Sequence, residues 1–430
     1  MEDICYIVTK YQKGVLYFSI KGQTNRLDSI AFTKTQGDET DIKIGDIVIA
    51  KVLNVVKNIN AAFIDYKPNK RGFLPLDNAY IPIITNRNYD GRILAGDEIL
   101  VQLEKEAVRT KDPVFTTNLS LAGKYCVISN SNLQRNISRK CPKDKKKLLL
   151  AAIPNDIPFG VIIRTHAMEL LRRAPIYYQN DNTDMNLQEI QMDLKPLIQE
   201  CMQLSEKMQL LLREGLHRTC YSFIYKAEPH YLTNLRDEIY IYPDQEEHEK
   251  NLTGKIRIIT DDAVLFHEIK AFASLYMPSL IDNISLYQED YPLQKLYSVE
   301  TKLNELLSAK VWLKSGAYLV IEKTEALYVI DVNSGKNISQ KENAQYIYSI
   351  NLEAAQELMR QIRLRNLTGI IIIDFISMND SAKEEFLIQE LRTLAKQDRI
   401  ATTVVDITEL GLVELTRKKT TKSLNEQLLS

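Results

Sequence analysis

Two apolar segments near the C-terminal end of the chain each finish in an aspartate. Residues 326–331 and 369–374 are rich in Ile, Val, Leu and Tyr, a composition typical of buried β-strands. The stretch Ser339-x-x-Glu342 has the pattern of a capping box, and Gly369 is a stop signal, so a helix is predicted between the two strands. The positions that mostly follow its 3.6-residue period are Ala344, Ile347, Asn351, Ala354, Ala355, Leu358 and Ile362.

This order of strand, helix and strand predicts a βαβ unit with parallel, adjacent strands. Asp331 and Asp374 would then lie at the same carboxyl edge of the sheet, where open α/β sheets place their sites. Two carboxylates at one edge suit Mg²⁺, which prefers oxygen ligands, and Asn333 follows the first aspartate closely. The alternative is that each aspartate only begins a turn, because Asp is a common turn residue.

The remaining pattern predicts several further parts. Residues 4–40 alternate as strands do but complete no unit, so their partners are expected elsewhere in the chain. Short strands separated by turn signals between residues 41 and 117 predict a small barrel. A mixed region to about Lys195 precedes an amphipathic helix that runs through Glu214, and more short strands continue to about residue 286.

Composition narrows the class of protein. The 430 residues are 45% hydrophobic and 26% charged with a net charge of −1, as in a globular protein of two to four compact units. The N-terminus lacks the features of a signal peptide, and no apolar run has the length of a membrane span. The five cysteines show no Cys-x-x-Cys spacing, and the five histidines show no metal-ligand spacing. A cytoplasmic protein without disulfides or a histidine-based metal site is expected.

Three blocks of sequence resemble one known family, the ribonuclease E/G endoribonucleases. Residues 45–52, 61–66 and 71–76 resemble an S1-type OB barrel, and residues 118–125 and 160–165 resemble the family's 5′-sensor region. Residues 324–335, 351–355, 360–367 and 372–376 resemble the family's catalytic domain, and this last match is the most specific. The resemblance covers essentially the whole chain and favours the ribonuclease G branch.

The resemblance implies a multidomain α+β and α/β fold. Its parts would be an RNase H-like piece (1–40 and 206–286), the inserted S1 barrel (41–117), a 5′ sensor (118–205) and a DNase I-like catalytic subdomain (287–430). It also implies catalytic roles for Asp331, Asn333 and Asp374, with both aspartates as ligands of Mg²⁺, for which Mn²⁺ could substitute. The expected reaction is cleavage of single-stranded RNA to products with a 5′-phosphate and a 3′-hydroxyl, in RNA processing or decay.

The resemblance further implies two places that bind RNA. Arg164 and Thr165 match the pocket for a 5′-monophosphate, although His166 and Ala167 stand where better-known members carry small residues. Phe63, Phe73 and Lys111 match the S1 surface, where aromatic rings stack bases and lysine contacts phosphate. By pattern alone, the two phenylalanines are predicted to lie in the barrel core, because apolar strand residues are usually buried. The resemblance reverses that order and favours the RNA-binding surface.

The C-terminal segment departs from the family. Residues 411–420 resemble the ribonuclease G branch, but the cysteine pair that forms its intersubunit zinc link is missing before Ser430. No structural zinc is therefore expected, and any homo-oligomer would not be bridged by zinc.

Two other functions fit parts of the pattern. A non-cleaving RNA-binding or ribosome-assembly factor could share the architecture, but it would have little use for the intact set Asp331, Asn333 and Asp374. A metal-dependent phosphatase or other phosphodiesterase would need no S1 barrel. The set of three residues and the barrel together favour the endoribonuclease.

Overall fold

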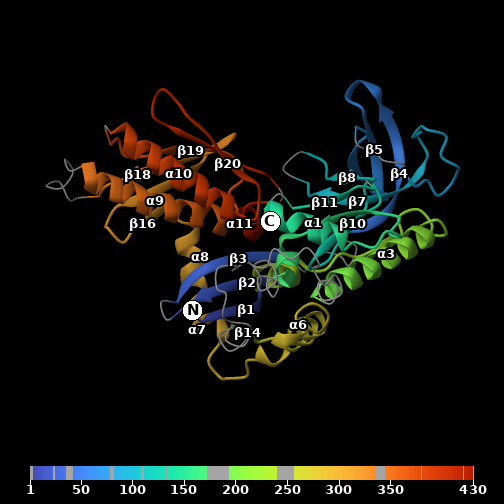
Figure 1. The fold of residues 1–430 in the computed structure, drawn as a ribbon, viewed down its shortest axis with the longest axis horizontal. Helices are drawn as coiled ribbons and strands as arrows, with labels where there is room; N and C mark the ends of the chain where they lie inside the picture. The colour runs from blue at the N-terminus through green and yellow to red at the C-terminus, as the bar shows by residue number, and fades with distance from the viewer. Residues whose placement is uncertain are drawn as a thin grey trace, which may run out of the picture. The chain divides into compact units, whose positions relative to one another are not determined.

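The chain forms two compact units, Met1–Gln36 with His248–Ser430 and Gly37–Glu247 (Figure 1). The computed structural model describes residues 3–22, 25–34, 42–77, 82–107, 111–131, 133–138, 140–171, 193–239, 256–335, 344–378, 380–419 and 421–429. Both units mix helices with sheets, as the multidomain α+β prediction required. The predicted capping box at Ser339 and Glu342 lies outside the described residues.

The first sheet of the first unit joins the N-terminal strands to a distant segment. Its order is β15-β14-β1-β2-β3, and β1 pairs in parallel with β14, with Ile4 opposite Ile256. The prediction that the N-terminal strands find partners elsewhere is confirmed. The elements are β1 (Ile4–Tyr11), β2 (Gly14–Lys21), β3 (Arg26–Lys34), β14 (Ile256–Thr260), α6 (Ala263–Tyr276), η4 (Pro278–Asn283) and β15 (Ile284–Leu286).

The second sheet of this unit contains the predicted βαβ unit. Its order is β16-β17-β18-β19-β21-β20, and β18 and β19 are parallel, as predicted. Helices α9 and α10 cover one face, where the buried residues of the sheet and helices form one core (Figure 1). The strands are β16 (Lys310–Trp312), β17 (Tyr318–Lys323), β18 (Leu327–Asn333), β19 (Gly369–Asp374), β20 (Thr402–Ile407) and β21 (Val413–Arg417). The helices are α7 (Leu293–Leu296), α8 (Val299–Leu307), α9 (Ala344–Leu364), α10 (Ser381–Gln397) and α11 (Leu424–Leu429).

The helix between the two aspartate strands ends before the predicted stop. Asn366 takes a left-handed conformation with φ of 49°, and its amide donates to the Arg363 carbonyl. The Leu367 amide donates to the Ile362 carbonyl, which completes a Schellman motif. The prediction that Gly369 stops the helix is wrong, because Asn366 ends it and Gly369 begins β19.

A charged cluster ties α9 to the first sheet of the same unit. The Glu357 carboxylate accepts hydrogen bonds from Arg26 of β3 at 2.7 Å and from Arg360 of its own helix at 2.7 Å. Arg360 also donates to the Leu27 carbonyl at 2.7 Å. Burial alone would raise the pKa of Glu357, but Arg360 and Arg26 hold that pKa below its usual value. Helix α9 is thus fixed at its C-terminal half.

The second unit contains a closed barrel of five strands. β4 pairs with both β5 and β7, and the ring closes through β6 and β8. Gly72 is required inside it, because a Cβ there would come 2.5 Å from the Phe115 ring. This closed five-strand barrel fits the predicted S1-type fold. Its strands are β4 (Ile47–Val56), β5 (Ala61–Lys67), β6 (Lys70–Pro75), β7 (Glu98–Lys105) and β8 (Val114–Thr116), with η1 (Lys57–Ile59) between β4 and β5.

A smaller sheet follows the barrel in the same unit, in the order β11-β12-β10-β9. Helix α3 packs against it, with Leu197, Cys201 and Met208 buried in a shared core. β13 adds to the barrel strand β4, a pairing that the sequence pattern did not predict. The elements are β9 (Ser120–Ala122), β10 (Cys126–Ser129), β11 (Arg135–Ile137), α1 (Lys143–Ala151), β12 (Gly160–Ile163), η2 (Thr165–Leu171), α3 (Lys195–Gly215), β13 (Phe223–Tyr225) and α4 (His230–Ile239).

All five cysteines are free thiols in the structure. Among the residues that the structure describes, no helix combines the length and the apolar character that a membrane span needs.

Candidate functional site

Asp331 and Asp374 lie directly opposite each other on neighbouring strands. They are register partners in the parallel pair of β18 and β19, each near the carboxyl end of its strand. Neighbouring strands are about 4.8 Å apart, and register partners project to the same face. The structure therefore places the two predicted aspartates side by side.

Both carboxylates face away from the helices. Ile330 and Val332 of β18 are buried in the core under α9, and Asp331 and Asn333 alternate with them. On β19, Ile373 is buried in the same core and Asp374 is exposed. The pair thus lies on the face of the sheet that α9 and α10 do not cover.

Asn333 is held against the first aspartate. Its Nδ2 atom donates a hydrogen bond to Asp331 Oδ2 at 2.7 Å. The bond fixes one oxygen of the carboxylate and the orientation of the amide together. All three predicted residues at this edge are therefore brought into one group.

Helix α9 braces the loops around the pair from the other face. Asn351 is fully buried, donates to the Ile376 carbonyl at 2.7 Å and accepts from the Ile376 amide at 3.2 Å. Glu353 accepts from the Lys314 amide at 2.7 Å, which holds the turn between β16 and β17. Asn351 appeared in the sequence only as one position of the helix face. A polar residue on an otherwise apolar stripe was the signal that could have identified its role.

A glycine lets two loops of this edge approach closely. Gly335 follows β18 with φ of +73°, and a Cβ there would come 2.5 Å from the Gly316 carbonyl oxygen. A side chain would force apart the loop after Asn333 and the turn before β17. The close approach of these two loops next to the carboxylates therefore requires glycine at position 335.

The donor set at the edge fits a hard divalent ion. Two carboxylates and an amide offer oxygen ligands only, which is the set that Mg²⁺ and Mn²⁺ prefer. Across the described parts of the chain, no cluster of three or more His, Cys, Asp or Glu side chains is arranged to hold a metal. A site of two protein carboxylates suits Mg²⁺, which usually retains several waters and binds phosphate oxygens.

Two of the three residues predicted to contact RNA on the barrel lie side by side on its outer surface. Phe63 and Phe73 are register partners on β5 and β6, half-buried, with ring centroids 5.8 Å apart. Their strand neighbours Ile64 and Leu74 fill the barrel core instead. The phenylalanines are thus surface residues of the barrel and not part of its core.

Charged side chains border these two rings. The Arg71 guanidinium lies 5.0 Å from the centroid of Phe63 and donates to Asp112 at 2.8 Å. Lys111 is exposed and precedes Asp112, and the Phe73 amide donates to the Pro113 carbonyl. Arg71 was missed from the sequence, because it becomes part of this surface only through the pairing of β5 with β6.

Arg164 and Thr165 lie at the end of β12 in the smaller sheet. Arg164 donates to Asp237 at 2.7 Å and to the Gly123 carbonyl. Thr165 donates to the Ser138 hydroxyl at 3.2 Å. Burial alone would raise the pKa of Asp237, but Arg236 and Arg164 lower it below its usual range. The predicted phosphate-binding arginine is therefore already paired with a charged carboxylate.

The loop beside Arg164 is held by a second carboxylate. Glu200 of α3 accepts hydrogen bonds from the amides of Lys124 and Tyr125 at 2.6 Å each and of Cys126 at 2.9 Å. Three converging amides form a concave anion site, and here the protein's own carboxylate fills it. Glu200 thereby orients the carbonyl of Gly123 toward Arg164.

His166 follows Arg164 and Thr165 and is buried. Burial lowers the pKa of the imidazole from 6.5 to about 4. The Arg164 charge also lowers this pKa, whereas the Asp237 carboxylate raises it. The imidazole is therefore neutral at physiological pH.

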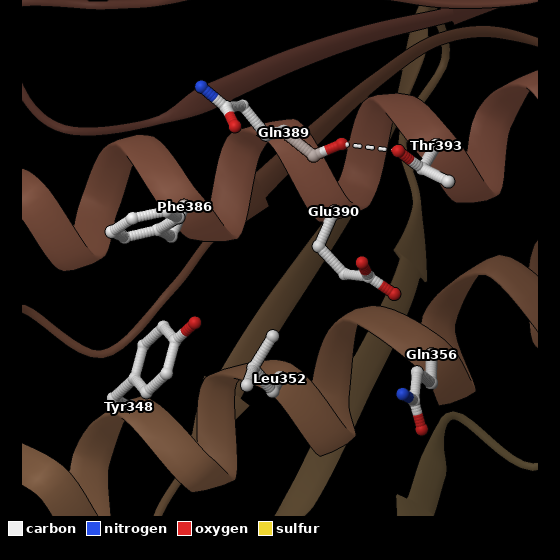
Figure 2. Close-up of a pocket in the computed structure, with 7 residues that line it drawn as sticks. All are labelled: Tyr348, Leu352, Gln356, Phe386, Gln389, Glu390 and Thr393. Atoms are coloured by element: carbon white, nitrogen blue, oxygen red, sulfur yellow. Dashed lines mark hydrogen bonds between the residues drawn. The ribbon is translucent and has the colours of Figure 1, made fainter.

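A surface groove lies on the helix-covered side of the sheet that carries Asp331 and Asp374. Figure 2 shows its lining side chains on α9 and α10. The groove has a volume of about 420 Å³. Within it, the Thr393 hydroxyl donates to the Gln389 carbonyl at 2.9 Å. Because the two helices cover the face opposite to Asp331 and Asp374, we assign the groove no part in the chemistry. Its lining residues are Tyr348, Leu352, Gln356, Phe386, Gln389, Glu390 and Thr393.

Fold and site define a multidomain α+β protein with a small closed barrel and a separate carboxylate pair on an α/β sheet. The model of the Ribonuclease E/G family matches residues 120–420. The chain is 31% identical over 404 residues to ribonuclease G of Haemophilus influenzae, covering 90% of this chain and 74% of that protein. It is 28% identical to ribonuclease G of Escherichia coli strain K12, covering 90% of this chain and 74% of that protein.

A third relative is matched over a smaller share of its length. Ribonuclease E of Haemophilus influenzae is 30% identical over 395 residues, which cover 89% of this chain but only 39% of that protein. The chain therefore spans about two fifths of the ribonuclease E relatives. It belongs to the ribonuclease E/G family.

Proposed function

We propose that this protein is a metal-dependent endoribonuclease that cleaves single-stranded RNA in RNA processing or decay. The observation that carries the proposal is the register pairing of Asp331 with Asp374, with Asn333 bonded to Asp331. Family membership supports an RNA substrate, because the relatives are named ribonucleases. The products would carry a 5′-phosphate and a 3′-hydroxyl.

Each residue at the edge has a distinct role in this proposal. Asp331 and Asp374 hold Mg²⁺ or Mn²⁺, which when bound supplies an activated water and positive charge beside the scissile phosphate. Asn333 keeps the Asp331 carboxylate in one orientation through its 2.7 Å hydrogen bond. Asn351 fixes the backbone that follows Asp374, so the two carboxylates keep their spacing.

The barrel would hold the RNA strand away from the reacting phosphate. Phe63 and Phe73 present ring faces or edges at the surface, and stacking a base on such a ring contributes about 1–3 kcal/mol. Arg71 adds positive charge beside the Phe63 ring, and Lys111 is an exposed cation in the segment that leads to Pro113, whose carbonyl accepts from the Phe73 amide. This combination favours an unpaired strand, whose bases can turn outward.

Arg164 and Thr165 would recognise a 5′-monophosphate. A guanidinium carries five N–H donors, so Arg164 can bond Asp237, Gly123 and a phosphate oxygen together. Asp237 positions the guanidinium but also weakens its attraction for an anion. We therefore expect sensing of the 5′ end to modulate cleavage and not to be required for it.

The sheets suggest how the catalytic parts are organised. We interpret the sheet of β1, β2, β3, β14 and β15 as the RNase H-like piece, because it joins the N-terminal strands to residues that follow the barrel. The sheet that carries Asp331 and Asp374 would be the DNase I-like subdomain.

One experiment tests the function directly. A 5′-labelled, AU-rich single-stranded oligoribonucleotide is incubated with the protein and Mg²⁺, Mn²⁺ or EDTA, and the product ends are identified by mass spectrometry. Discrete internal cuts with either ion, ending in a 3′-hydroxyl and a 5′-phosphate, are expected, and none in EDTA. Binding without any products in Mg²⁺ would instead indicate a non-cleaving RNA-binding factor. Cuts that persist in EDTA would contradict the metal-dependent mechanism.

A further inference from the structure

Three side chains on the open face of the catalytic sheet continue the rows that contain the carboxylates. Lys310 is opposite Val320, Val320 is opposite Asp331, and Asp331 is opposite Asp374. In the next row, Trp312 is opposite Tyr318, and Tyr318 is opposite Asn333. Register partners share a face of the sheet, so Lys310, Trp312 and Tyr318 project on the same side as the carboxylates. Two strand spacings, roughly 10 Å, separate the lysine from Asp331.

The three side chains form a compact exposed group, which we name the β16–β17 platform. The rings of Trp312 and Tyr318 pack edge to face with centroids 5.1 Å apart. The Lys310 Nζ atom lies 3.6 Å from the Tyr318 centroid and 4.0 Å from the Trp312 centroid. Trp312 nevertheless remains 63% exposed. Val311, between the lysine and the tryptophan, packs against the helix-covered core, which fixes the direction of its two neighbours.

We propose that the β16–β17 platform stacks an unpaired base of the RNA strand whose scissile phosphate lies at Asp331 and Asp374. The inference rests on the proposed function and assigns a further binding residue, Trp312, to the same site. The exposed rings of Trp312 and Tyr318 can stack a base. Lys310 beside them can contact a backbone phosphate, and the carboxylate pair lies on the same face of the sheet.

The energies favour replacement of the lysine by a base. An exposed cation–π contact contributes about 0.5–1 kcal/mol, whereas base stacking on an aromatic ring contributes about 1–3 kcal/mol. The flexible Lys310 side chain can therefore leave the rings and contact a backbone phosphate while the base takes its place. Although Lys310 lies over the rings, most of the Trp312 side chain remains exposed to solvent. A stacked base would cover this exposed surface.

The chain offers a direct optical test, because Trp312 is its single tryptophan. In the double variant Asp331→Asn and Asp374→Asn, which is expected not to cleave, Trp312 fluorescence is followed during titration with a single-stranded oligoribonucleotide. Quenching is expected to saturate together with binding measured by anisotropy of a labelled RNA. A series of oligonucleotides, each with one abasic position, should then show one position at which quenching is lost. Saturated binding without quenching, or equal quenching at every abasic position, would overturn the proposal.

A second test uses cleavage by otherwise unmodified protein. Trp312→Ala is expected to lower kcat/KM by roughly five- to a hundredfold, and Trp312→Phe by less than about threefold, because the ring is retained. With the wild-type protein, the abasic substrate should have a kcat/KM that is lower than that of the intact substrate by the same factor. With Trp312→Ala, the two substrates should have the same kcat/KM. Phe386→Ala is a matched control, since Phe386 is also exposed at 61% but lies on α10, on the other face of the sheet. Equal losses in the two alanine variants, or no loss in Trp312→Ala, would contradict the platform.

The two proposals fail separately. If wild type binds RNA and cuts nothing, the proposed function is wrong, and the fluorescence titration still decides whether the platform stacks a base. If wild type cuts RNA while quenching is absent and Trp312→Ala is unaffected, the function stands and the platform is wrong.

Discussion

Asn351 brackets the backbone of Ile376 with two hydrogen bonds, one donated at 2.7 Å and one accepted at 3.2 Å. Its side chain is fully buried within α9, and Ile376 lies just beyond Asp374. The helix that connects the two carboxylate strands therefore also fixes the chain where the second strand ends. The geometry of the pair depends on this contact as well as on the sheet itself.

Replacement of Asn351 by Ala is expected to lower activity more than it lowers RNA affinity. Loss of both hydrogen bonds leaves the Ile376 backbone groups without these partners, which costs about 1–3 kcal/mol of stability. Looser carboxylate spacing should reduce kcat while KM changes little. Steady-state kinetics and thermal melting measure both effects. Gln356→Ala on the same helix is the control, and an Asn351→Ala variant with unchanged kcat would show that the contact is only structural.

Removal of either barrel phenylalanine is expected to weaken RNA binding without unfolding the barrel. Phe63→Ala or Phe73→Ala should reduce affinity by roughly five- to a hundredfold, because stacking is lost from the surface. Ile64→Ala, in the barrel core, should instead cost about 2–5 kcal/mol of stability. Binding and melting temperature are measured together. A large fall in melting temperature for the phenylalanine variants would assign those rings a structural role.

Loss of the Arg164 charge is expected to reduce the preference for a 5′-monophosphate. Arg164→Gln should lower the ratio of cleavage rates for 5′-monophosphate and 5′-hydroxyl RNA by about tenfold or more, since charged hydrogen bonds contribute about 1.5–3 kcal/mol.

The same substitution leaves Asp237 without one of its cationic partners. The double variant Arg164→Gln with Asp237→Asn removes that imbalance and should recover stability but not the preference. An unchanged rate ratio in a stable variant would remove Arg164 from the phosphate site.

Acidification is expected to destabilise the fold around His166. Its pKa is lowered from 6.5 to about 4 in the folded protein, so the unfolded chain binds the proton more tightly. Stability is therefore retained above pH 6.5 and lost as the pH falls from 6.5 toward 4, by about 2 kcal/mol at pH 5. Arg164, Arg236 and Asp237 surround the imidazole, and burial is the main cause of its lowered pKa.

Denaturant melts at pH 7.5 and pH 5 test this dependence. His166→Asn should lose less stability between the two values than wild type. His217→Asn, which removes an exposed imidazole, should behave as wild type does. An equal loss of unfolding free energy between pH 7.5 and pH 5 in wild type and His166→Asn would contradict the assignment of this pH dependence to His166.

The sequence was sufficient for the local units and for their order. Apolar runs before Asp331 and Asp374, with one helical period between them, predicted parallel neighbouring strands, because only a crossover of that length returns the chain to the same edge. Short strands separated by turn signals predicted the barrel. These features depend on residues that are close in the sequence, so the sequence pattern alone predicts them.

Features that depend on distant residues were not predictable. The pairing of Ile4 with Ile256, and of Arg164 with Asp237, joins positions that share no local pattern. Phe63 and Phe73 could have faced either side of the barrel, since alternation does not say which face is the core until the sheet closes. The pattern predicts the helix stop at Gly369 and not at Asn366, because asparagine is a weaker signal for a left-handed helix end than glycine.

The most direct test of the central claim is single-turnover RNA cleavage at limiting Mg²⁺ by Asp331→Asn and Asp374→Asn. Each change keeps the size of the side chain and removes the negative charge that a hard cation requires. Cleavage should be abolished in both variants, while RNA affinity measured by anisotropy stays within about twofold of wild type, because the barrel surface is unchanged. Near-wild-type turnover of either variant would contradict the assignment of Asp331 and Asp374 as the metal-binding pair.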